Sequence, residues 1–135
     1  MYLIPIEAKI SPIDGKGVFA LQKIMKGEMV WKFNPEHDKD LSVEEFNNLD
    51  KEVQSNLKRV AYLSPTSNRY VYPPKDDLAN FTNHSKNNNL SVVIDTKISE
   101  EPYFIANRNI EEGEELTNNY AEFDEDTKGD GGEWI

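Results

Sequence analysis

Two short segments carry the side chains best suited to chemistry. Residues 80–85, with the sequence NFTNHS, set amide, imidazole and hydroxyl groups side by side where a purely structural chain would place apolar residues. Residues 113–120, with the sequence GEELTNNY, form a short strand-like run that ends on Tyr120. The chain has two histidines and no cysteine, so neither segment completes the nucleophile and base pair that a hydrolase needs. By residue type alone, His84 is typical of a structural histidine.

Turns and short strands must hold these two segments. Residues 11–17, with the sequence SPIDGKG, predict a turn, and residues 18–21 are an apolar run after it. The turn lacks the glycine-lysine-serine/threonine ending of a phosphate-binding loop. Residues 20–30 and 106–116 share alanine, isoleucine, glycine and glutamate at the same four offsets. This echo favours two similar strand–turn–strand units, in which the glycine permits the turn.

Many short strands, frequent turns and few helical residues predict a mostly β single domain. The helical insert covers about residues 42–63, where Ser42 and Glu45 fit a capping box and apolar residues recur at three-to-four spacing. Asp50 is suited to cap a second helix, so one long helix and two short ones are equally compatible with the sequence. We expect the insert to cover one side of the sheet and to carry no chemistry.

The two segments resemble the paired motifs of the SET domain, a lysine methyltransferase fold in which such segments thread past each other. The sequence GKGVFA at residues 15–20 is similar to a third family element, so the resemblance covers about residues 3–123. It implies several short sheets with the helical insert and a threaded, pseudoknot-like C-terminal segment. The SET domain would span residues 1–123, followed by an acidic C-terminal tail at residues 124–135 that could fold back onto it.

The resemblance also implies a reaction, the transfer of a methyl group from S-adenosylmethionine to a lysine side chain of a protein substrate. Tyr120 matches the family's catalytic tyrosine. A phenol is uncharged at neutral pH and can direct an oxygen lone pair at the reacting groups without trapping lysine as ammonium. An apolar channel lowers the pKa of lysine by desolvation, and near-attack positioning contributes about 7–11 kcal/mol.

Two sets of further site residues follow from the resemblance. Those that it assigns to the cofactor are Gly15, Lys16, Gly17, Phe19, Asn83 and His84. Channel walls need aromatic residues, and the candidates are Tyr72, Tyr103, Phe123 and Trp134. No metal is assigned. Residues 37–40, with the sequence HDKD, are predicted to be an exposed loop because no second histidine stands at ligand spacing.

Three departures from the family pattern qualify the resemblance. The family usually continues Asn-His-Ser with Cys-x-Pro-Asn, whereas residues 86–89 are KNNN, with Asn88 in place of proline. Asn119 stands where the family often has aspartate before the catalytic tyrosine. The absence of cysteine rules out the zinc-binding tail of many relatives, which leaves the channel's lid to the acidic C-terminus. These departures keep an alternative open: a catalytically weak or inactive SET-like module that binds basic proteins through its acidic C-terminal region.

Charge is concentrated at one end of the chain. The net charge is −10, and residues 111–135 hold ten acidic residues and one basic residue. This pattern is typical of a solvated acidic tail, and it is also suited to attracting cationic partners. We therefore expect a basic, lysine-containing protein or peptide as substrate, bound along a strand edge. Direct nucleic-acid binding is disfavoured because it needs a basic face, and a homodimer is compatible with the sequence.

The sequence shows neither a candidate membrane-spanning segment nor a signal-peptide pattern. No apolar run approaches the ~20 residues needed to span a bilayer. Residues 1–7 lack the basic start and long apolar stretch of a signal peptide. We expect a soluble intracellular protein, cytoplasmic by default, with a nuclear location or secretion as an effector left open.

Overall fold

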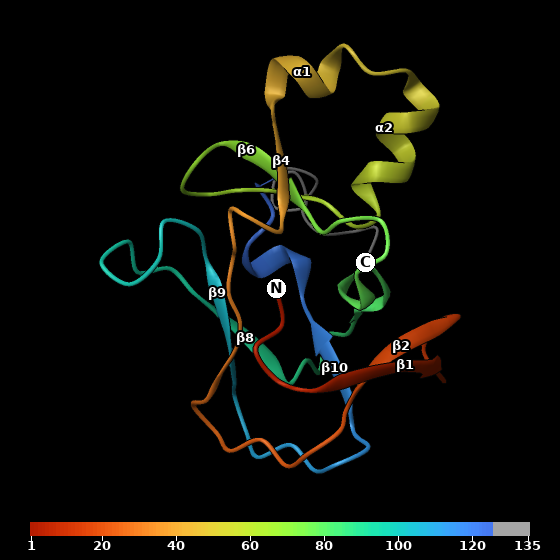
Figure 1. Ribbon diagram of the computed structural model, residues 1–135, viewed down its shortest axis with the longest axis vertical. Helices are drawn as coiled ribbons and strands as arrows, with labels where there is room; N and C mark the ends of the chain where they lie inside the picture. Colours follow the sequence, from red (N-terminus) through yellow and green to blue (C-terminus); the bar gives the residue numbers. More distant parts are fainter. Residues whose placement is uncertain (126–135) are drawn as a thin grey trace.

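The computed structural model describes residues 1–125, which form three small sheets and two short α-helices (Figure 1). The largest sheet contains β1 (Ile6–Ile10), β2 (Lys16–Ala20), β10 (Glu115–Asn118) and β7 (Asn83–His84), in that spatial order. β2 is antiparallel to β1 and to β10, whereas β10 is parallel to β7. β10, the last strand within residues 1–125, therefore lies between two earlier strands, in agreement with the predicted threading of the C-terminal segment.

The second sheet is fully antiparallel and supplies much of the core. Its order is β3 (Met29–Trp31), β9 (Tyr103–Ala106) and β8 (Leu90–Val93). The ring of Trp31 packs 5.3 Å from that of Phe104, measured between centroids. The buried cluster around these rings draws residues from all three sheets, which is why the small sheets form one core.

The third sheet carries the helical insert at one end of the molecule. Its order is β4 (Lys39–Ser42), β6 (Arg69–Tyr72) and β5 (Tyr62–Leu63), all antiparallel. Between β4 and β5 the chain forms α1 (Val43–Asn47) and α2 (Lys51–Lys58), on the opposite side of the molecule from the β1–β2 hairpin (Figure 1). The insert is thus two short helices, one of the two arrangements compatible with the sequence.

The start of α1 confirms the capping box. The Ser42 hydroxyl accepts from the backbone N–H of Glu45 at 3.0 Å, and the Glu45 carboxylate accepts from the Ser42 N–H at 2.9 Å. Two otherwise unpaired backbone donors at the helix start are satisfied in this way. Phe46 then stacks on Tyr70 at 4.0 Å, which fixes α1 against the third sheet. α2 buries no residue completely.

The two echoed segments pair with each other. Gly27 donates its N–H to the carbonyl of Ala106 at 2.8 Å, and Gly113 donates to that of Ala20 at 2.7 Å. Both glycines have φ near +90°, a conformation that favours glycine over residues with a side chain. The shared isoleucines, at positions 24 and 110, exchange two backbone hydrogen bonds of 2.8 Å. The sequence repeat therefore corresponds to two similar turns that hydrogen-bond to each other in a reciprocal way.

The first residue of the predicted acidic tail, Asp124, packs against the domain. Asp124 is buried, and its carboxylate accepts from the backbone N–H of Leu63 at 2.7 Å. The rest of the predicted tail, residues 126–135, lies outside the described residues, and with it the candidate channel residue Trp134. The domain boundary at residue 123 stays a prediction. Both α-helices within residues 1–125 are too short and too polar to span a bilayer.

Candidate active site

The two motif segments lie side by side. In the parallel pair β7–β10, Asn83 is in register with Thr117 and His84 with Asn118. The N–H of Ser85 continues the pairing with a 2.9 Å hydrogen bond to the carbonyl of Asn118. The two motif segments, which are distant in sequence, are therefore neighbours in one sheet.

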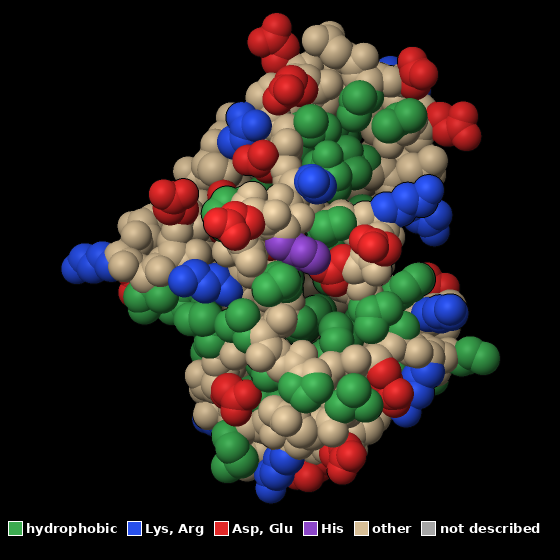
Figure 2. Space-filling view, in the orientation of Figure 1, with side chains coloured by type: hydrophobic (Ala, Val, Ile, Leu, Met, Phe, Trp, Pro, Cys, Tyr) green, Lys and Arg blue, Asp and Glu red, His purple; other side chains and the backbone are tan. Residues whose placement is uncertain are grey.

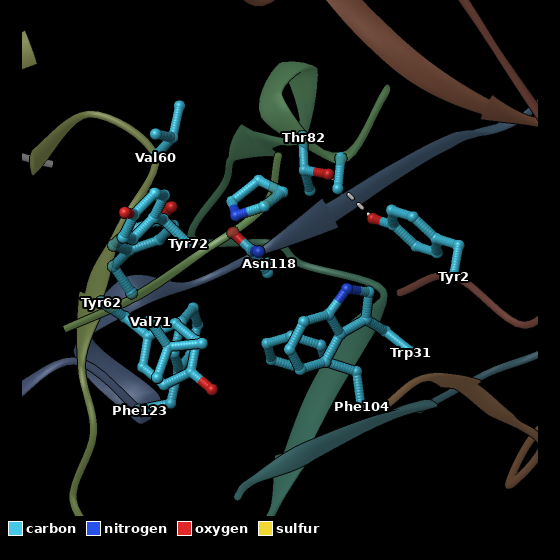
Figure 3. A pocket seen from close by; sticks show the side chains of 13 residues that line it. Tyr2, Trp31, Val60, Tyr62, Val71, Tyr72, Thr82, Phe104, Asn118 and Phe123 are labelled. Carbon is cyan, nitrogen blue, oxygen red and sulfur yellow. Dashed lines mark hydrogen bonds between the residues drawn. The ribbon is translucent and has the colours of Figure 1, made fainter. Parts of the chain in front are cut away.

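A pocket with mainly apolar walls opens beside this pair of strands (Figure 3). Tyr120 lies in its wall, and so do two of the four predicted channel residues, Tyr72 and Phe123. Tyr103 is buried but does not line the pocket. The remaining lining residues are Tyr2, Trp31, Val60, Tyr62, Val71, Pro73, Ala79, Thr82, Phe104 and Asn118. The helical insert was expected only to cover the sheet, but Val60, just after α2, forms part of the pocket wall.

Tyr120 begins a short 3-10 helix, η2 (Tyr120–Glu122), whose start is capped by Asn119. The Asn119 side-chain oxygen accepts from the backbone N–H of Ala121 at 3.0 Å. Asparagine and aspartate cap helices about equally well, so this departure from the family pattern preserves the local geometry. The Tyr120 ring packs at 4.9 Å from that of Phe123.

The Tyr120 phenol is held in its neutral form. Burial raises its pKa above the usual value of 10, and the negative charge of Asp124 and the nearby Tyr2 raise it further. The Tyr2 hydroxyl, in the same pocket, shares a 2.9 Å hydrogen bond with that of Thr82 (Figure 3). A neutral phenol carries no negative charge that would hold an amine as ammonium.

Asn118 is a candidate site residue that the sequence analysis missed. It is 7 % exposed, it lines the pocket between Tyr72 and Trp31 (Figure 3), and its Oδ1 accepts no hydrogen bond from the described residues. A buried acceptor without a partner costs about 1–3 kcal/mol, so an N–H donor entering the pocket would gain that amount by satisfying it. The available signal was strand periodicity, because a residue two positions before Tyr120 faces the same side of an extended segment.

His84 has an unusual environment for an imidazole. Both ring nitrogens are buried, and neither has a hydrogen-bond partner within residues 1–125. Burial lowers the pKa of His84 below 6.5, and the positive charge of Lys86 lowers it further. The ring is therefore neutral at physiological pH. Buried polar groups are normally paired, so the two nitrogens mark an unusual place in the fold.

Asn83 points its side chain at the glycine-containing loop. Its Nδ2 lies 3.1 Å from the carbonyl oxygen of Asp14, 3.2 Å from that of Lys16 and 2.9 Å from a carboxylate oxygen of Glu115. The structure thus brings three of the predicted cofactor residues together, namely Gly15, Lys16 and Asn83. The amide nitrogen of Asn83 is already committed to protein acceptors.

Two of the predicted cofactor residues, Lys16 and Phe19, lie on β2, the strand that begins within the glycine-containing loop. Lys16 is exposed, with its ammonium 5.6 Å from the centre of the Phe81 ring. Phe19 is 7 % exposed, and the ammonium of Lys9 lies 4.5 Å from its ring centre. Such cation–π contacts occur in both structural and binding settings. Phe19 therefore packs on the face of the sheet beside the loop.

The asparagines after the first motif replace a rigid proline by hydrogen bonds. Asn88 donates from Nδ2 to the carbonyl of Leu90 at 2.8 Å and to the carboxylate of Glu122 at 2.9 Å. Asn89 is 2 % exposed, donates to the Glu115 carbonyl at 2.8 Å and accepts from the Thr117 N–H at 2.9 Å. The turn is therefore fixed to β10 without proline.

The HDKD segment is less exposed than predicted. His37 Nε2 lies 2.6 Å from a carboxylate oxygen of Asp77, and Asp38 is 6 % exposed. The Asp38 Oδ2 atom accepts from the Met1 ammonium at 2.9 Å. Asp77 caps η1 (Leu78–Phe81), the short 3-10 helix that leads into β7. The cluster therefore helps to position the first motif. The prediction of an exposed loop is wrong for Asp38, which is buried, and for Lys39 and Asp40, which are exposed but form the start of β4.

Comparison with known proteins agrees with this arrangement. The SET domain family model matches residues 15–121, which is most of the chain. Among solved structures, the crystal structure of a Plasmodium falciparum "putative histone methyltransferase" aligns with a TM-score of 0.58 at 22% identity, over 87% of this chain and 93% of that chain. At this identity the likeness concerns the fold. No curated protein matches the chain. On its motifs, its fold and the extent of the family match, the chain belongs to the SET domain family.

Proposed function

We propose that this protein transfers a methyl group from S-adenosylmethionine to a lysine side chain of a protein substrate. The observation that carries the proposal is the pocket in which Tyr120 and the unpartnered oxygen of Asn118 share apolar walls. This pocket adjoins the paired strands that hold Asn83 and His84. Membership of the SET domain family supports the same reaction.

The residues around the glycine-containing loop fit the cofactor. The orphaned nitrogens of His84 offer polar groups to a bound ligand, and the space above Gly15 is open. When bound, S-adenosylmethionine supplies the electrophilic methyl group. The residues proposed to hold it are Gly15, Lys16, Gly17, Phe19, Asn83 and His84. Asn83 would act mainly by fixing the loop, because its amide nitrogen already contacts three protein acceptors.

The pocket prepares the lysine for attack. A lysine amine must lose its proton to become a nucleophile, and the aromatic walls destabilise the charged ammonium by desolvation. No Asp or Glu is among the described residues that line the pocket, so no carboxylate in its wall pairs directly with that charge. The amine would donate one N–H to Asn118 Oδ1, and the neutral Tyr120 hydroxyl would face the reacting nitrogen or methyl group. Positioning of this kind supplies much of the catalysis.

The substrate is proposed to be a basic, lysine-containing segment. The acidic end of the chain supports this, although several of its carboxylates also hold the fold. Glu122, for example, accepts from Asn88 and from the Val92 N–H, and Asp124 accepts from Leu63. On the face in Figure 2, acidic and basic side chains are interspersed around a central band of apolar side chains. Long-range attraction would therefore assist binding, with apolar contacts near the pocket adding specificity.

A methyl-transfer assay with product mapping tests the proposal. The protein is incubated with S-adenosylmethionine carrying an isotopically labelled methyl group and a lysine-rich protein extract, and the products are analysed by mass spectrometry. We expect labelled methyl groups on lysine side-chain nitrogens. An inactive SET-like module would instead bind basic proteins without incorporating label, and that result would overturn the enzymatic function. Binding of S-adenosylmethionine is measured in parallel by calorimetry.

A further inference from the structure

We propose that Glu115 is a positioning residue that latches the glycine-containing loop, and that position 17 must be glycine because of this latch. Glu115, Ser11 and Asn83 together are called the latch below. The consequence for cofactor binding rests on the proposed function, whereas the latch itself is a property of the fold.

The latch connects the start of the loop, β7 and β10 through one carboxylate. The Ser11 hydroxyl lies 2.7 Å and 2.9 Å from the two carboxylate oxygens of Glu115, and Asn83 donates to one of them at 2.9 Å. Ser11 and Glu115 are 104 positions apart in the chain. Hydrogen bonds to a charged acceptor are shorter and stronger than those between neutral groups. The carboxylate therefore ties the start of the loop to β10 and β7.

The same side chains set the shape of the loop between its ends. The Ser11 N–H donates to the carbonyl of Gly15 at 2.8 Å, and the Ser11 hydroxyl also accepts from the N–H of Ile13 at 2.9 Å. Asn83 also donates to the carbonyls of Asp14 and Lys16. Loop residues 11–17 are therefore held by Ser11 and Asn83 before any ligand binds.

The two glycines of the loop are required for different reasons. Gly15 has φ +45°, and a Cβ placed on it would meet no atom within 4 Å. Its requirement is conformational, since the left-handed region favours glycine. Gly17 lies outside that region, yet a Cβ there would collide with the Glu115 carboxylate oxygen and lie 2.8 Å from its carbon. The next nearest atom is the Ser11 Cβ, at 3.0 Å.

Because of this close contact, substitutions at Gly17 and Glu115 should have coupled effects on the loop. Alanine at position 17 would push the Glu115 carboxylate off Ser11 and Asn83, which opens the latch. Shortening residue 115 opens the latch as well, but it also removes the atoms with which the new methyl group collides. The two substitutions should therefore be strongly non-additive, as expected for residues in direct contact.

A double-mutant cycle on cofactor affinity tests this coupling. The proteins compared are the parent, Gly17→Ala, Glu115→Ala and the double variant, with S-adenosylmethionine affinity measured by calorimetry. We expect each single substitution to weaken binding about tenfold and the double variant to bind no worse than Glu115→Ala. Losses that multiply in the double variant, or a Gly17→Ala protein that binds as the parent does, would overturn the latch.

Glu114→Ala is the matched control. Glu114 is the neighbouring acid, and its carboxylate accepts from Asn89 at 3.1 Å and from the Glu111 N–H at 3.2 Å, away from the loop. Its replacement should leave cofactor affinity unchanged. An equal loss in Glu114→Ala and Glu115→Ala would mean that general weakening of β10, and not the latch, governs the loop.

Hydrogen–deuterium exchange separates the latch from the proposed function. We expect residues 11–17 to exchange faster in Glu115→Ala and in Ser11→Ala, with no change in the third sheet. Ser11→Ala also serves if the substitution in β10 prevents folding, because it removes one hydroxyl from a turn. Unchanged exchange in residues 11–17 overturns the latch. A parent protein that binds no S-adenosylmethionine overturns the proposed function instead, and the exchange result then decides the latch alone.

Discussion

His84 and Asn118 are register partners in the parallel pair β7–β10, and each carries buried polar atoms without a hydrogen-bond partner. Together they hold three of the four such atoms found in residues 1–125, the fourth being Asp38 Oδ1. Buried polar groups in folded proteins are normally paired, so a concentration of unpaired ones marks a place where the fold gives up stability. That place coincides with the strands on which the two motifs meet.

The first prediction concerns the balance between stability and binding at Asn118. Asn118→Leu removes a buried acceptor that has no partner, so we expect the free energy of unfolding to rise by about 1 kcal/mol. Methyl transfer should fall, because the substrate amine loses an acceptor. Urea denaturation measures the first effect and the labelling assay the second.

Asn89→Leu is the control for that prediction. Asn89 is also buried, but its side chain is hydrogen-bonded to β10 through the Glu115 carbonyl and the Thr117 N–H. Its replacement should lower the free energy of unfolding by about 1–3 kcal/mol, since partners are left unpaired. If both leucine variants were destabilised to the same extent, Asn118 would not be an unsatisfied site residue.

The second prediction is a pH dependence that arises from His84. Its pKa is lowered in the folded protein by burial and by Lys86, so the unfolded chain binds a proton near pH 6.5 before the native state does. Stability contributed by this group is present above pH 6.5 and is lost as the pH falls through the lower folded pKa. NMR titration of the imidazole should give a pKa below 6.5. A value above 6.5 would show that the ring has a charged or hydrogen-bonded partner.

The third prediction concerns salt. Attraction between the acidic end of the chain and a basic peptide acts between exposed charges, which are screened within ~10 Å at 0.1 M salt. Affinity for a lysine-rich peptide should therefore fall as sodium chloride is raised. The measurement is fluorescence anisotropy across a salt series. An affinity that stays flat would remove electrostatic steering and leave apolar contacts near the pocket as the source of binding.

Local features of the fold could be predicted from the sequence because the interacting groups are close along the chain. The Ser42–Glu45 capping box is an example, since both partners lie within one helical turn. The meeting of the two motif segments was also predicted, but through the family resemblance. Nothing in the spacing of residues alone fixes a parallel pair such as Asn83 with Thr117.

The features that were missed depend on contacts across the fold. The aromatic candidates look alike in sequence, yet Tyr72 and Phe123 line the pocket and Tyr103 does not. The face that each residue presents is decided by register and turn geometry, which periodicity does not specify over short strands. Asn119 counted as a departure by residue type, whereas its position as a helix cap makes the exchange for aspartate conservative.

The most direct test of the account is the initial rate of methyl transfer to lysine by the parent, Tyr120→Phe and Tyr70→Phe. Each variant loses one phenol hydroxyl from a packed ring, but Tyr70 stacks on Phe46 in the third sheet and does not line the pocket. With thermal unfolding checked for all three, we expect Tyr120→Phe to lower the rate by about 10²-fold or more and Tyr70→Phe to leave it unchanged. Equal rates for the parent and Tyr120→Phe would contradict the central claim that Tyr120 acts in methyl transfer.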